Sequence, residues 1–330
     1  MKKTIYIFQS GELKRKDNTL FFENEEGRKF IPVEDTQELM IFGELDLNKS
    51  LLEFCAQKEI TLHFFNHYGY YTGSFYPREH LNSGYMILKQ TEHYVDETKR
   101  YAIAYRFVRG AANNILRVLK YYRGRGKDLQ GIIDTIDSLV TSSANAQTIP
   151  ELMAYEGNIR ESYYKSFDII LDNADFTFEH RTKRPPKNEL NALISFGNSI
   201  LYTQVLSEIY RTHLDPRIGY LHTTNFRRFT LNLDVAEIFK PVLVDRLIFS
   251  LIGKKQLTKL HFAKETGGIL LTEKGRKIFI EAWDEKLKTT IKHRALNKEV
   301  SYRRLMRLEL YKLQKHMMGE KEYEPFEALW

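Results

Sequence analysis

Short apolar runs fill the first eighty or so positions of the chain, which is the pattern of β-strands. The runs are rich in β-branched and aromatic residues, and Gly, Asn or Asp separates them. One helix is expected among them, over 48–58, because Leu51, Leu52, Phe54 and Cys55 lie on or near one helical face. The pattern predicts strands over 4–8, 19–23, 39–42, 60–65 and 70–76.

The apolar spacing changes after Tyr76-Pro77-Arg78 to the 3.6-residue period of helices. One long amphipathic helix is predicted over 101–119. Pro216 and Pro241 are expected to mark helix ends, because proline lacks the backbone N–H that a helix interior uses. Further helices are predicted over 129–140, 149–171, 188–213, 234–250, 275–291 and 299–317, with a small β-turn element over 267–271.

These elements predict an α+β fold class, with a small N-terminal β-sandwich-like domain over residues 1–85 and a larger all-α domain over 86–330. A linker near 77–90 is expected to join them. The 330 residues are 42% hydrophobic and 13% aromatic, enough to fill a sizeable core, which excludes a disordered chain.

Cys55 is the single cysteine of the chain, so neither an intrachain disulfide nor a cysteine-based zinc cluster can form. This fits a reducing compartment. Charged residues interrupt every apolar run before the ~18 residues that a membrane span needs. The start of the chain is interpreted as a first strand rather than a signal peptide. We therefore expect a soluble, cytoplasmic protein.

The charge is unevenly distributed along the chain, whose formal net charge is +7. Residues 1–80 hold ten basic and thirteen acidic side chains, a net −3, which leaves +10 for the remainder. Nine Lys and Arg lie within 99–127 without one Asp or Glu, and Arg181, Lys183, Arg184 and Lys187 form a second cluster. A basic run is ordinarily a solvated helix face. This one, without compensating acids, favours a polyanionic partner for the second half.

Motifs for phosphate loops, dinucleotide binding and a nucleophilic serine are absent, and acids and a histidine remain as candidates. Glu156 lies in an otherwise apolar helix directly before Gly157, which suggests that a ligand approaches the backbone there. A Pro- and Gly-punctuated loop ends at His222, and Asp234 and Glu237 share one face of the next helix. Two carboxylates with one imidazole suit Mg²⁺ or Mn²⁺, and hence metal-assisted phosphodiester chemistry.

Each of these residues also has a structural interpretation. Glu156 could form a buried ion pair with Arg160, one helical turn further on. A lone histidine such as His222 is commonly a hydrogen-bonded structural residue. Asp234 at a helix start is most simply a capping or first-turn acid stabilised by the helix dipole. Spacing alone leaves both interpretations open.

Several motifs resemble one known family, the CRISPR-associated adaptation integrases called Cas one. The similarity runs in order through nearly the whole chain except about the last eighty residues. Residues 38–43 and 57–65, with Gly69 and Gly73, resemble the β domain of the family. Residues 153–164 resemble its glutamate motif, and 184–197, with Pro185-Pro186 before Asn188, resemble its following helix. The loop at 214–222 and the helix at 233–246 complete the similarity.

The resemblance implies that Glu156, His222 and Glu237 are catalytic metal ligands, with Asp234 as an alternative ligand or a residue behind the ligands. Family members carry either Asp or Glu at the position matched to Glu237, so the assignment between these two acids stays open. Ile159 and Lys240 differ from the residues most common in the family, but neither difference removes a ligand.

The resemblance further implies a Mg²⁺- or Mn²⁺-dependent DNA endonuclease and integrase that inserts short double-stranded fragments, called spacers, into a repeat array by 3′-hydroxyl transesterification. Its partners would be DNA, a second copy bound through the N-terminal β domain, and the small protein Cas two. Alternatives are a non-catalytic DNA-binding scaffold and a repair nuclease for branched DNA. We expect DNA contacts from Arg106, Arg109, Arg117, Lys120, Arg123, Arg125, Arg184, Arg227 and Arg228.

Overall fold

A computed structural model describes residues 2–77, 81, 83–224, 229–265, 267–293 and 296–329. The chain divides into two compact units, residues 1–80 and residues 81–330. The first holds strands and one helix, and the second is built mainly of helices, which confirms the predicted α+β class. The expected linker near 77–90 is wrong in its second half, because helix α2 (Gly84–Val95) begins there and Ser83 caps it.

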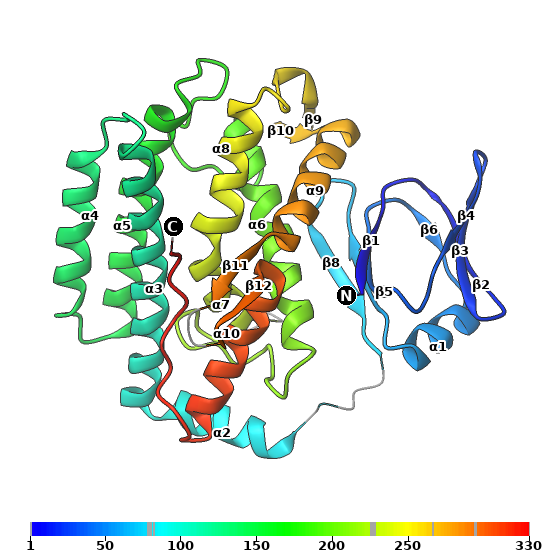
Figure 1. Ribbon diagram of the computed structural model, residues 1–330, viewed down its shortest axis with the longest axis horizontal. Coiled ribbons are helices and arrows are strands. Elements are labelled where there is room, and N and C mark those ends of the chain that lie inside the picture. Colours follow the sequence, from blue (N-terminus) through cyan, green and yellow to red (C-terminus); the bar gives the residue numbers. More distant parts are fainter. Residues whose placement is uncertain are drawn as a thin grey trace. The chain divides into compact units, whose positions relative to one another are not determined.

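Two four-stranded sheets form the first unit, with a helix at one end of both (Figure 1). In one sheet β1 and β7 pair in parallel with β5, and β8 pairs antiparallel with β7. The apolar faces enclose a core that includes Leu13, Leu39, Leu51 and Leu62. The elements are β1 (Lys3–Ile7), β2 (Gly11–Lys16), β3 (Thr19–Asn24), β4 (Gly27–Ile31), β5 (Thr36–Ile41), β6 (Leu45–Asp46), α1 (Lys49–Gln57), β7 (Thr61–Phe65) and β8 (Tyr71–Phe75).

The second sheet contains strands that the apolar pattern did not predict. Strands β2 and β4 are rich in charged residues, and they pair with the apolar strand β3 on either side. Only Leu13 of β2 and Ile31 of β4 are buried. A strand that contributes one side chain to the core carries too little apolar periodicity to be recognised from its own sequence.

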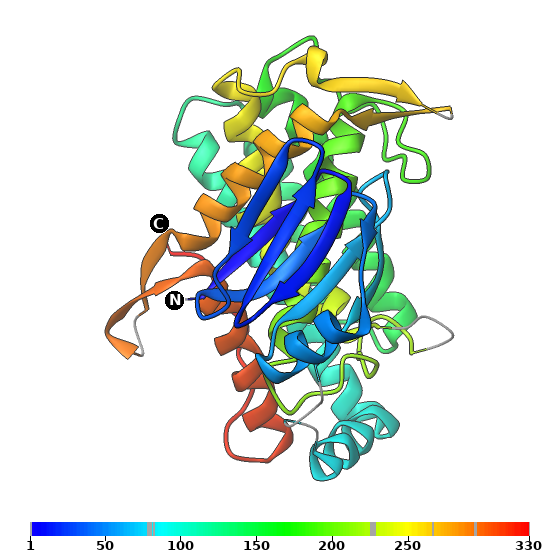
Figure 2. The ribbon, with the colours of Figure 1, turned by 90° about the vertical axis from the view of Figure 1, so that its right-hand side faces the viewer.

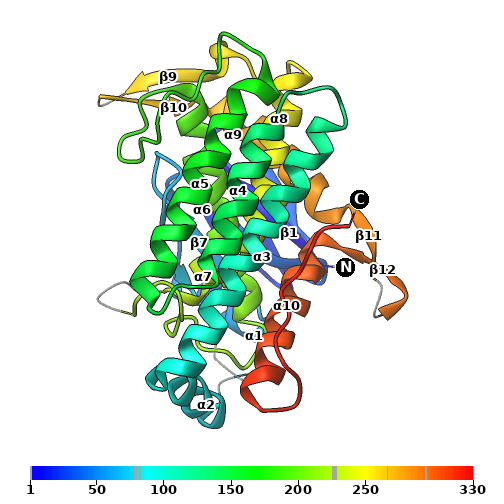
Figure 3. The ribbon, with the colours of Figure 1, turned by 90° about the vertical axis from the view of Figure 1, so that its left-hand side faces the viewer.

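Helices side by side form the body of the second unit, with α4 packed against both α3 and α5 (Figure 3). Helix α6 is apolar on nearly every face and is buried along almost its whole length, as expected of a central helix. Within the described residues, no helix is long and apolar enough to cross a bilayer. The main helices besides α2 are α3 (Glu97–Arg123), α4 (Gln130–Ser143), α5 (Ile149–Leu171), α6 (Glu189–Ile209), α7 (Leu231–Lys240), α8 (Arg246–Gly253), α9 (Glu273–Lys288) and α10 (Tyr302–Met317).

Pro241 does not end a helix, contrary to the prediction. Helix α7 continues directly into a π-helical turn, η1 (Pro241–Asp245), and then into α8. Because Pro241 has no backbone N–H, it cannot donate to the carbonyl of Glu237 four residues earlier. The chain accommodates the proline by widening one turn, a form of helix that occurs often at functional sites.

Two hairpins project from the helical unit, so this unit is not purely helical (Figure 2). The first, β9 (Phe262–Glu265) with β10 (Gly268–Leu271), contains the expected β-turn element. The second, β11 (Thr290–His293) with β12 (Lys298–Ser301), replaces the predicted last residues of one helix and first residues of the next. A short 3-10 turn, η2 (Lys259–His261), precedes β9. Side-chain caps from Thr272 and Ser301 set the starts of α9 and α10.

Candidate metal centre

Helix α5 carries Glu156 and Arg160 on one face, one turn apart. Thr148 caps its first turn, and Pro150 lies where a proline suits a helix start. The Nε atom of Arg160 lies 3.6 Å from Oε1 of Glu156, and the Arg160 side chain is 12% exposed. This contact agrees with the structural interpretation of Glu156 as an ion-pair partner of Arg160.

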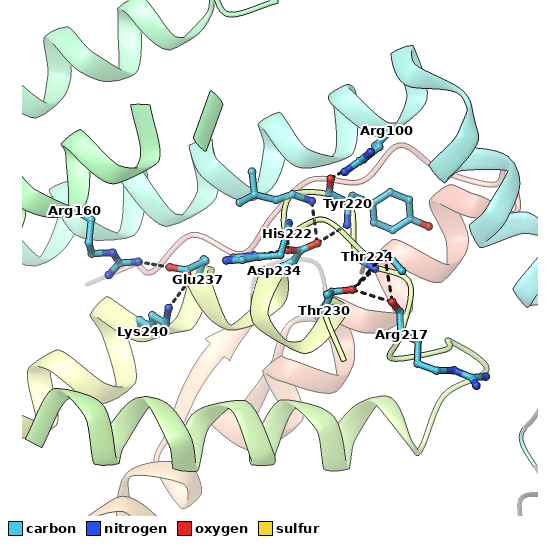
Figure 4. A network of polar contacts seen from close by, with 12 residues as sticks. Arg100, Arg160, Arg217, Tyr220, His222, Thr224, Thr230, Asp234, Glu237 and Lys240 are labelled. Atoms are coloured by element: carbon cyan, nitrogen blue, oxygen red, sulfur yellow. Dashed lines mark hydrogen bonds and ion pairs between the residues drawn. The ribbon is translucent and has the colours of Figure 1, made fainter. Parts of the chain in front are cut away.

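Glu237, on α7, lies between two cations from different parts of the fold (Figure 4). Nη2 of Arg160 donates to its Oε2 at 2.5 Å, and Nζ of Lys240, one turn further along, contacts its Oε1. The Glu237 side chain is only 5% exposed. Burial alone would raise the pKa of Glu237, but the charges of Lys240 and Arg160 outweigh burial and lower this pKa to about 2. Glu237 is therefore held as a carboxylate at neutral pH.

Asp234, in the first turn of α7, uses both carboxylate oxygens to hold the loop that carries His222 (Figure 4). Its Oδ2 accepts from the backbone N–H groups of Tyr220, at 2.6 Å, and Leu221, at 3.1 Å. Its Oδ1 accepts from the backbone N–H of His222, at 2.9 Å, and from Nδ1 of the same residue, at 2.8 Å. Four donors occupy a carboxylate that is fully buried.

The contact with Asp234 assigns the tautomer of His222. An ionised carboxylate only accepts, so Nδ1 of His222 must carry a proton. In neutral His222 this leaves the lone pair on Nε2, which is the arrangement of a metal-binding histidine supported from behind by a carboxylate. Burial would lower the pKa of His222, but the hydrogen bond and the charge of Asp234 raise it. Asp234 therefore fits a supporting role behind the ligands better than ligation.

The three candidate ligands, Glu156, His222 and Glu237, are electrostatically coupled. Burial is the main cause that raises the pKa of Glu156, and the charge of Glu237 raises it further, while Arg160, Lys240 and His222 act in the opposite direction. The charge of His222 also acts on Glu237. Arg160 contacts both Glu156 of α5 and Glu237 of α7, and Asp234 ties the His222 loop to α7 one turn before Glu237. Glu237 is buried, whereas the Glu156 side chain is 25% exposed.

The donor set suits a hard divalent ion, although the protein's own cations now neutralise it. No three His, Cys, Asp or Glu side chains among the described residues are arranged to hold a metal ion directly. Arg160 and Lys240 contact the Glu237 oxygens that a metal ion would use. Two carboxylates and a histidine whose Nδ1 is already bonded nevertheless match the preferences of Mg²⁺ and Mn²⁺. The residues therefore fit such an ion.

Gly157 adjoins open space. Apart from its chain neighbours and the backbone of its own helix, no atom of the described residues lies within 4 Å of a Cβ built at this position. The described part of the fold therefore gives no packing reason for glycine here. Room for a ligand beside Glu156, which the sequence suggested, is compatible with this geometry.

The basic run of α3 is uncompensated in sequence but largely compensated in space. Arg106 and Arg109 pair with Glu322 and Glu324 near the end of the chain, at 2.6 and 2.8 Å. Arg117 is exposed. Further pairs join Lys99 to Glu92, Lys120 to Asp137 and Lys127 to Asp172.

The other expected DNA-binding residues differ in their surroundings. Arg123 donates to Gln130 at 2.5 Å, and Arg125 stacks on the Tyr121 ring. Arg184 is exposed in the loop before α6. Arg227 and Arg228 lie outside the described residues.

Two further residues belong to the electrostatics of this site, although the sequence analysis did not single out either one as a site residue. Burial, Arg181 and Lys240 lower the pKa of Lys183, while the charges of Glu156 and Glu237 act to raise it. Asp245, 1% exposed in η1, has its pKa raised to about 7 by burial, against the charge of Arg160. The sequence offered one signal that could have identified Asp245, because it is the single acid inside the mostly apolar run 241–252.

Comparison with known proteins identifies the family. Residues 5–285 match the family model for CRISPR associated protein Cas1. The chain is 63% identical over 330 residues, the full length of both chains, to the CRISPR-associated endonuclease Cas1 2 of Thermodesulfovibrio yellowstonii. A solved CAS1 protein from Thermotoga maritima is 48% identical and superposes with a TM-score of 0.89, covering 98% of this chain and 100% of that one. A casposase bound to integration product shares the fold at 18% identity, with a TM-score of 0.89 over 100% of this chain and 95% of its own. The chain belongs to the Cas1 family, the family that its sequence motifs resemble.

Proposed function

We propose that this protein is a metal-dependent DNA endonuclease and integrase of CRISPR adaptation. A 3′-hydroxyl of a short double-stranded fragment would attack a phosphodiester at the edge of a repeat. The new bond joins that oxygen to phosphorus, the original P–O3′ bond breaks, and the departing strand end takes up a proton. The observation that carries this proposal is the His222 imidazole, held through Nδ1 by Asp234 one turn before Glu237, while Arg160 contacts the carboxylates of both Glu237 and Glu156.

The chain's own residues divide the work of this site. Glu156, His222 and Glu237 would hold Mg²⁺ or Mn²⁺, which when bound polarises the phosphate and stabilises the leaving oxygen. Asp234 keeps the proton on Nδ1 of His222 and fixes the loop at Tyr220. Arg160 and Lys240 hold Glu237 ionised and supply positive charge next to the position of the phosphate.

The proposed partners follow from family membership and from the charge of the two units. The helical unit, which carries the positive charge, would bind fragments and the repeat array through phosphate contacts. The β unit would join two copies of the chain, and the small protein Cas2 would complete the assembly in the cytoplasm.

A strand-transfer assay tests the proposed chemistry. The full-length protein with Cas2, a labelled fragment and a repeat-containing duplex is expected to give a joined product in Mn²⁺ or Mg²⁺ and none in EDTA. A fragment ending in a 3′-dideoxynucleotide should give no product, because the attacking oxygen is absent. Tight, salt-sensitive binding without any transfer would support a scaffold instead. Cleavage of branched DNA without a need for repeat sequence or a 3′-hydroxyl would support a repair nuclease.

Arg184 and Arg106 should differ in their effect on DNA binding. Arg184 is exposed in the loop that also carries Lys183, whereas Arg106 already pairs with Glu322. We expect Arg184→Ala to weaken duplex binding and to reduce the slope of log affinity against log salt concentration by about one. Arg106→Ala should leave that slope unchanged. Fluorescence anisotropy at about 50 to 200 mM salt measures both slopes. Equal slopes for the two variants would contradict this assignment.

A further inference from the structure

The chain after α10 turns back and runs along α3, as Figures 1 and 3 show. Buried anchors hold this C-terminal segment, residues 322–329. Tyr323 is fully buried and donates to Oε1 of Glu309 at 2.6 Å, and the backbone N–H of Phe326 donates to the same oxygen at 3.0 Å. Lys312 pairs with Oε2 of Glu309 at 2.5 Å and donates to the carbonyl of Glu324 at 2.6 Å. The segment is therefore an integral layer of the helical unit.

Asn114, fully buried on α3, links the C-terminal segment to α7. Its Nδ2 donates to the carbonyl of Phe326 at 3.0 Å and to the carbonyl of Ile238 at 2.9 Å. Its Oδ1 accepts from the backbone N–H of Ala328 at 2.8 Å. One amide thus joins three segments, and the α7 carbonyl that it binds belongs to the residue directly after Glu237.

Two packing contacts reinforce the place where Asn114 links α3, α7 and the C-terminal segment, which we call the joint. Phe326 stacks on Phe239 of α7, with ring centroids 5.4 Å apart and planes 10° apart. Gly110 lies one turn before Asn114 on α3, where a Cβ would meet Cβ of Pro325 at 2.6 Å. The glycine therefore allows the C-terminal segment to approach the α3 backbone closely, next to the amide that binds α7.

The position of this joint connects it with the metal centre. Pro241 withdraws the helical donor from the carbonyl of Glu237, and Asn114 donates to the next carbonyl in that same turn. At its other end, α3 binds the histidine loop, since Nε of Arg100 donates to the carbonyl of Tyr220 at 3.0 Å. Helix α3 thus supports both polypeptide segments that bring Asp234, His222 and Glu237 together.

We propose that Asn114 and the C-terminal segment are positioning elements of the metal centre, which fix the turn of α7 that presents Glu237. The identity of the ion in this inference rests on the proposed function. The expected change in hydrogen exchange of α7 does not depend on it. It assigns to residues 322–329, which lie beyond the matched family region, a role in the site.

Asn114→Asp tests the joint selectively. An ionised aspartate keeps an acceptor for the N–H of Ala328 but loses both donations, to Ile238 and to Phe326. We expect Mn²⁺ affinity, measured by electron paramagnetic resonance on the full-length protein, to fall about tenfold, the lower range seen when a supporting residue of a metal site is lost. Hydrogen exchange at the amides of residues 237–240, 242 and 243 should accelerate in the metal-free protein.

Asn113→Ala is the matched control. Asn113 also bonds the C-terminal segment, through Nδ2 to Oε1 of Glu327 at 2.6 Å, but it makes no hydrogen bond to α7 among the described residues. It should leave both Mn²⁺ affinity and α7 exchange unchanged. Phe326→Leu provides a second test that buries no new charge, and it should change both readouts in the direction of Asn114→Asp.

Several outcomes would decide the inference. Unchanged α7 exchange in both test variants would overturn it, as would equal effects in Asn113→Ala. Lower unfolding free energy in Phe326→Leu with wild-type Mn²⁺ affinity would reduce the segment to a purely structural role and also overturn the inference. If wild-type protein binds no Mn²⁺ at all, the proposed metal chemistry fails, whereas faster α7 exchange in the variants would still support the coupling.

Discussion

Glu156→Gln is expected to abolish metal-dependent strand transfer and DNA cleavage while the fold persists. The change keeps the shape of the side chain but removes one of the two carboxylates that are proposed to bind the same ion. Loss of a residue that supports a metal ligand already lowers metal affinity or activity about 10- to 100-fold. We therefore expect strand transfer to fall at least about 100-fold here. Burial and Glu237 both raise the pKa of Glu156, so its charged form is disfavoured in the fold. A neutral glutamine should therefore preserve or increase the free energy of unfolding at pH 7.

Glu161→Gln is the matched control for that experiment. Glu161 lies on the same helix but is 73% exposed, and Lys165 pairs with it at 4.0 Å. Strand transfer, Mn²⁺ affinity and unfolding should all stay close to wild type. Wild-type strand transfer in Glu156→Gln would remove Glu156 from the site. Loss of activity together with loss of the folded structure, seen by circular dichroism, would also contradict the expectation that the fold tolerates the change.

The elements that sequence periodicity predicted well are those whose side chains fill a core. The helix predicted over 149–171 coincides with α5 (Ile149–Leu171), and the long helix over 101–119 lies within α3. Strands β2 and β4 were missed because neighbouring strands, rather than their own apolar residues, hold them in the sheet. The helix end predicted at Pro241 was wrong because a π-helical turn accommodates the proline, and all five residues of this turn are buried.

The sequence suggested candidate site residues one by one but not the contacts between them. Spacing could select Glu156, His222 and the pair Asp234 and Glu237, yet it left the roles of the two α7 acids open. Only the geometry distinguishes them, because Asp234 is occupied by four loop donors while Glu237 faces two cations.

The ion pairs of the basic run on α3 also could not be predicted without the structure. The acids that neutralise Arg106 and Arg109 follow them by more than two hundred positions along the chain. No local composition rule detects such pairs, because a charge count within a window sees only neighbours in sequence.

Asp234→Asn should weaken both the metal site and the fold, with a characteristic dependence on pH. The amide oxygen can replace only part of a carboxylate that accepts from Tyr220, Leu221 and His222, and its NH₂ group would face N–H donors. A buried donor left unsatisfied costs about 1–3 kcal/mol, so we expect a loss of that size at pH 8. Mn²⁺ affinity should fall about 10- to 100-fold, because His222 loses the partner that fixes its tautomer.

The pH dependence follows from His222. In the wild type its pKa is raised, since the hydrogen bond and charge of Asp234 outweigh burial. A raised histidine pKa contributes stability that is fully present below the unfolded value, about 6.5, and that disappears as pH rises through the folded value. Asp234→Asn removes this contribution, so its loss of unfolding free energy should be larger at pH 5.5 than at pH 8. Urea unfolding without added metal at both values measures the difference.

Asp215→Asn supplies the control, because it makes the same substitution in the same loop. The Asp215 side chain is 9% exposed, and its carboxylate accepts from the backbone N–H and the guanidinium of Arg217 rather than from His222. Asp215→Asn should therefore leave Mn²⁺ affinity unchanged. Equal losses for Asp234→Asn at the two pH values would show that the carboxylate holds only the backbone of the loop. Unchanged Mn²⁺ affinity in that variant would mean that the tautomer of His222 is set by another partner, and would return Asp234 to the purely structural role of a first-turn acid.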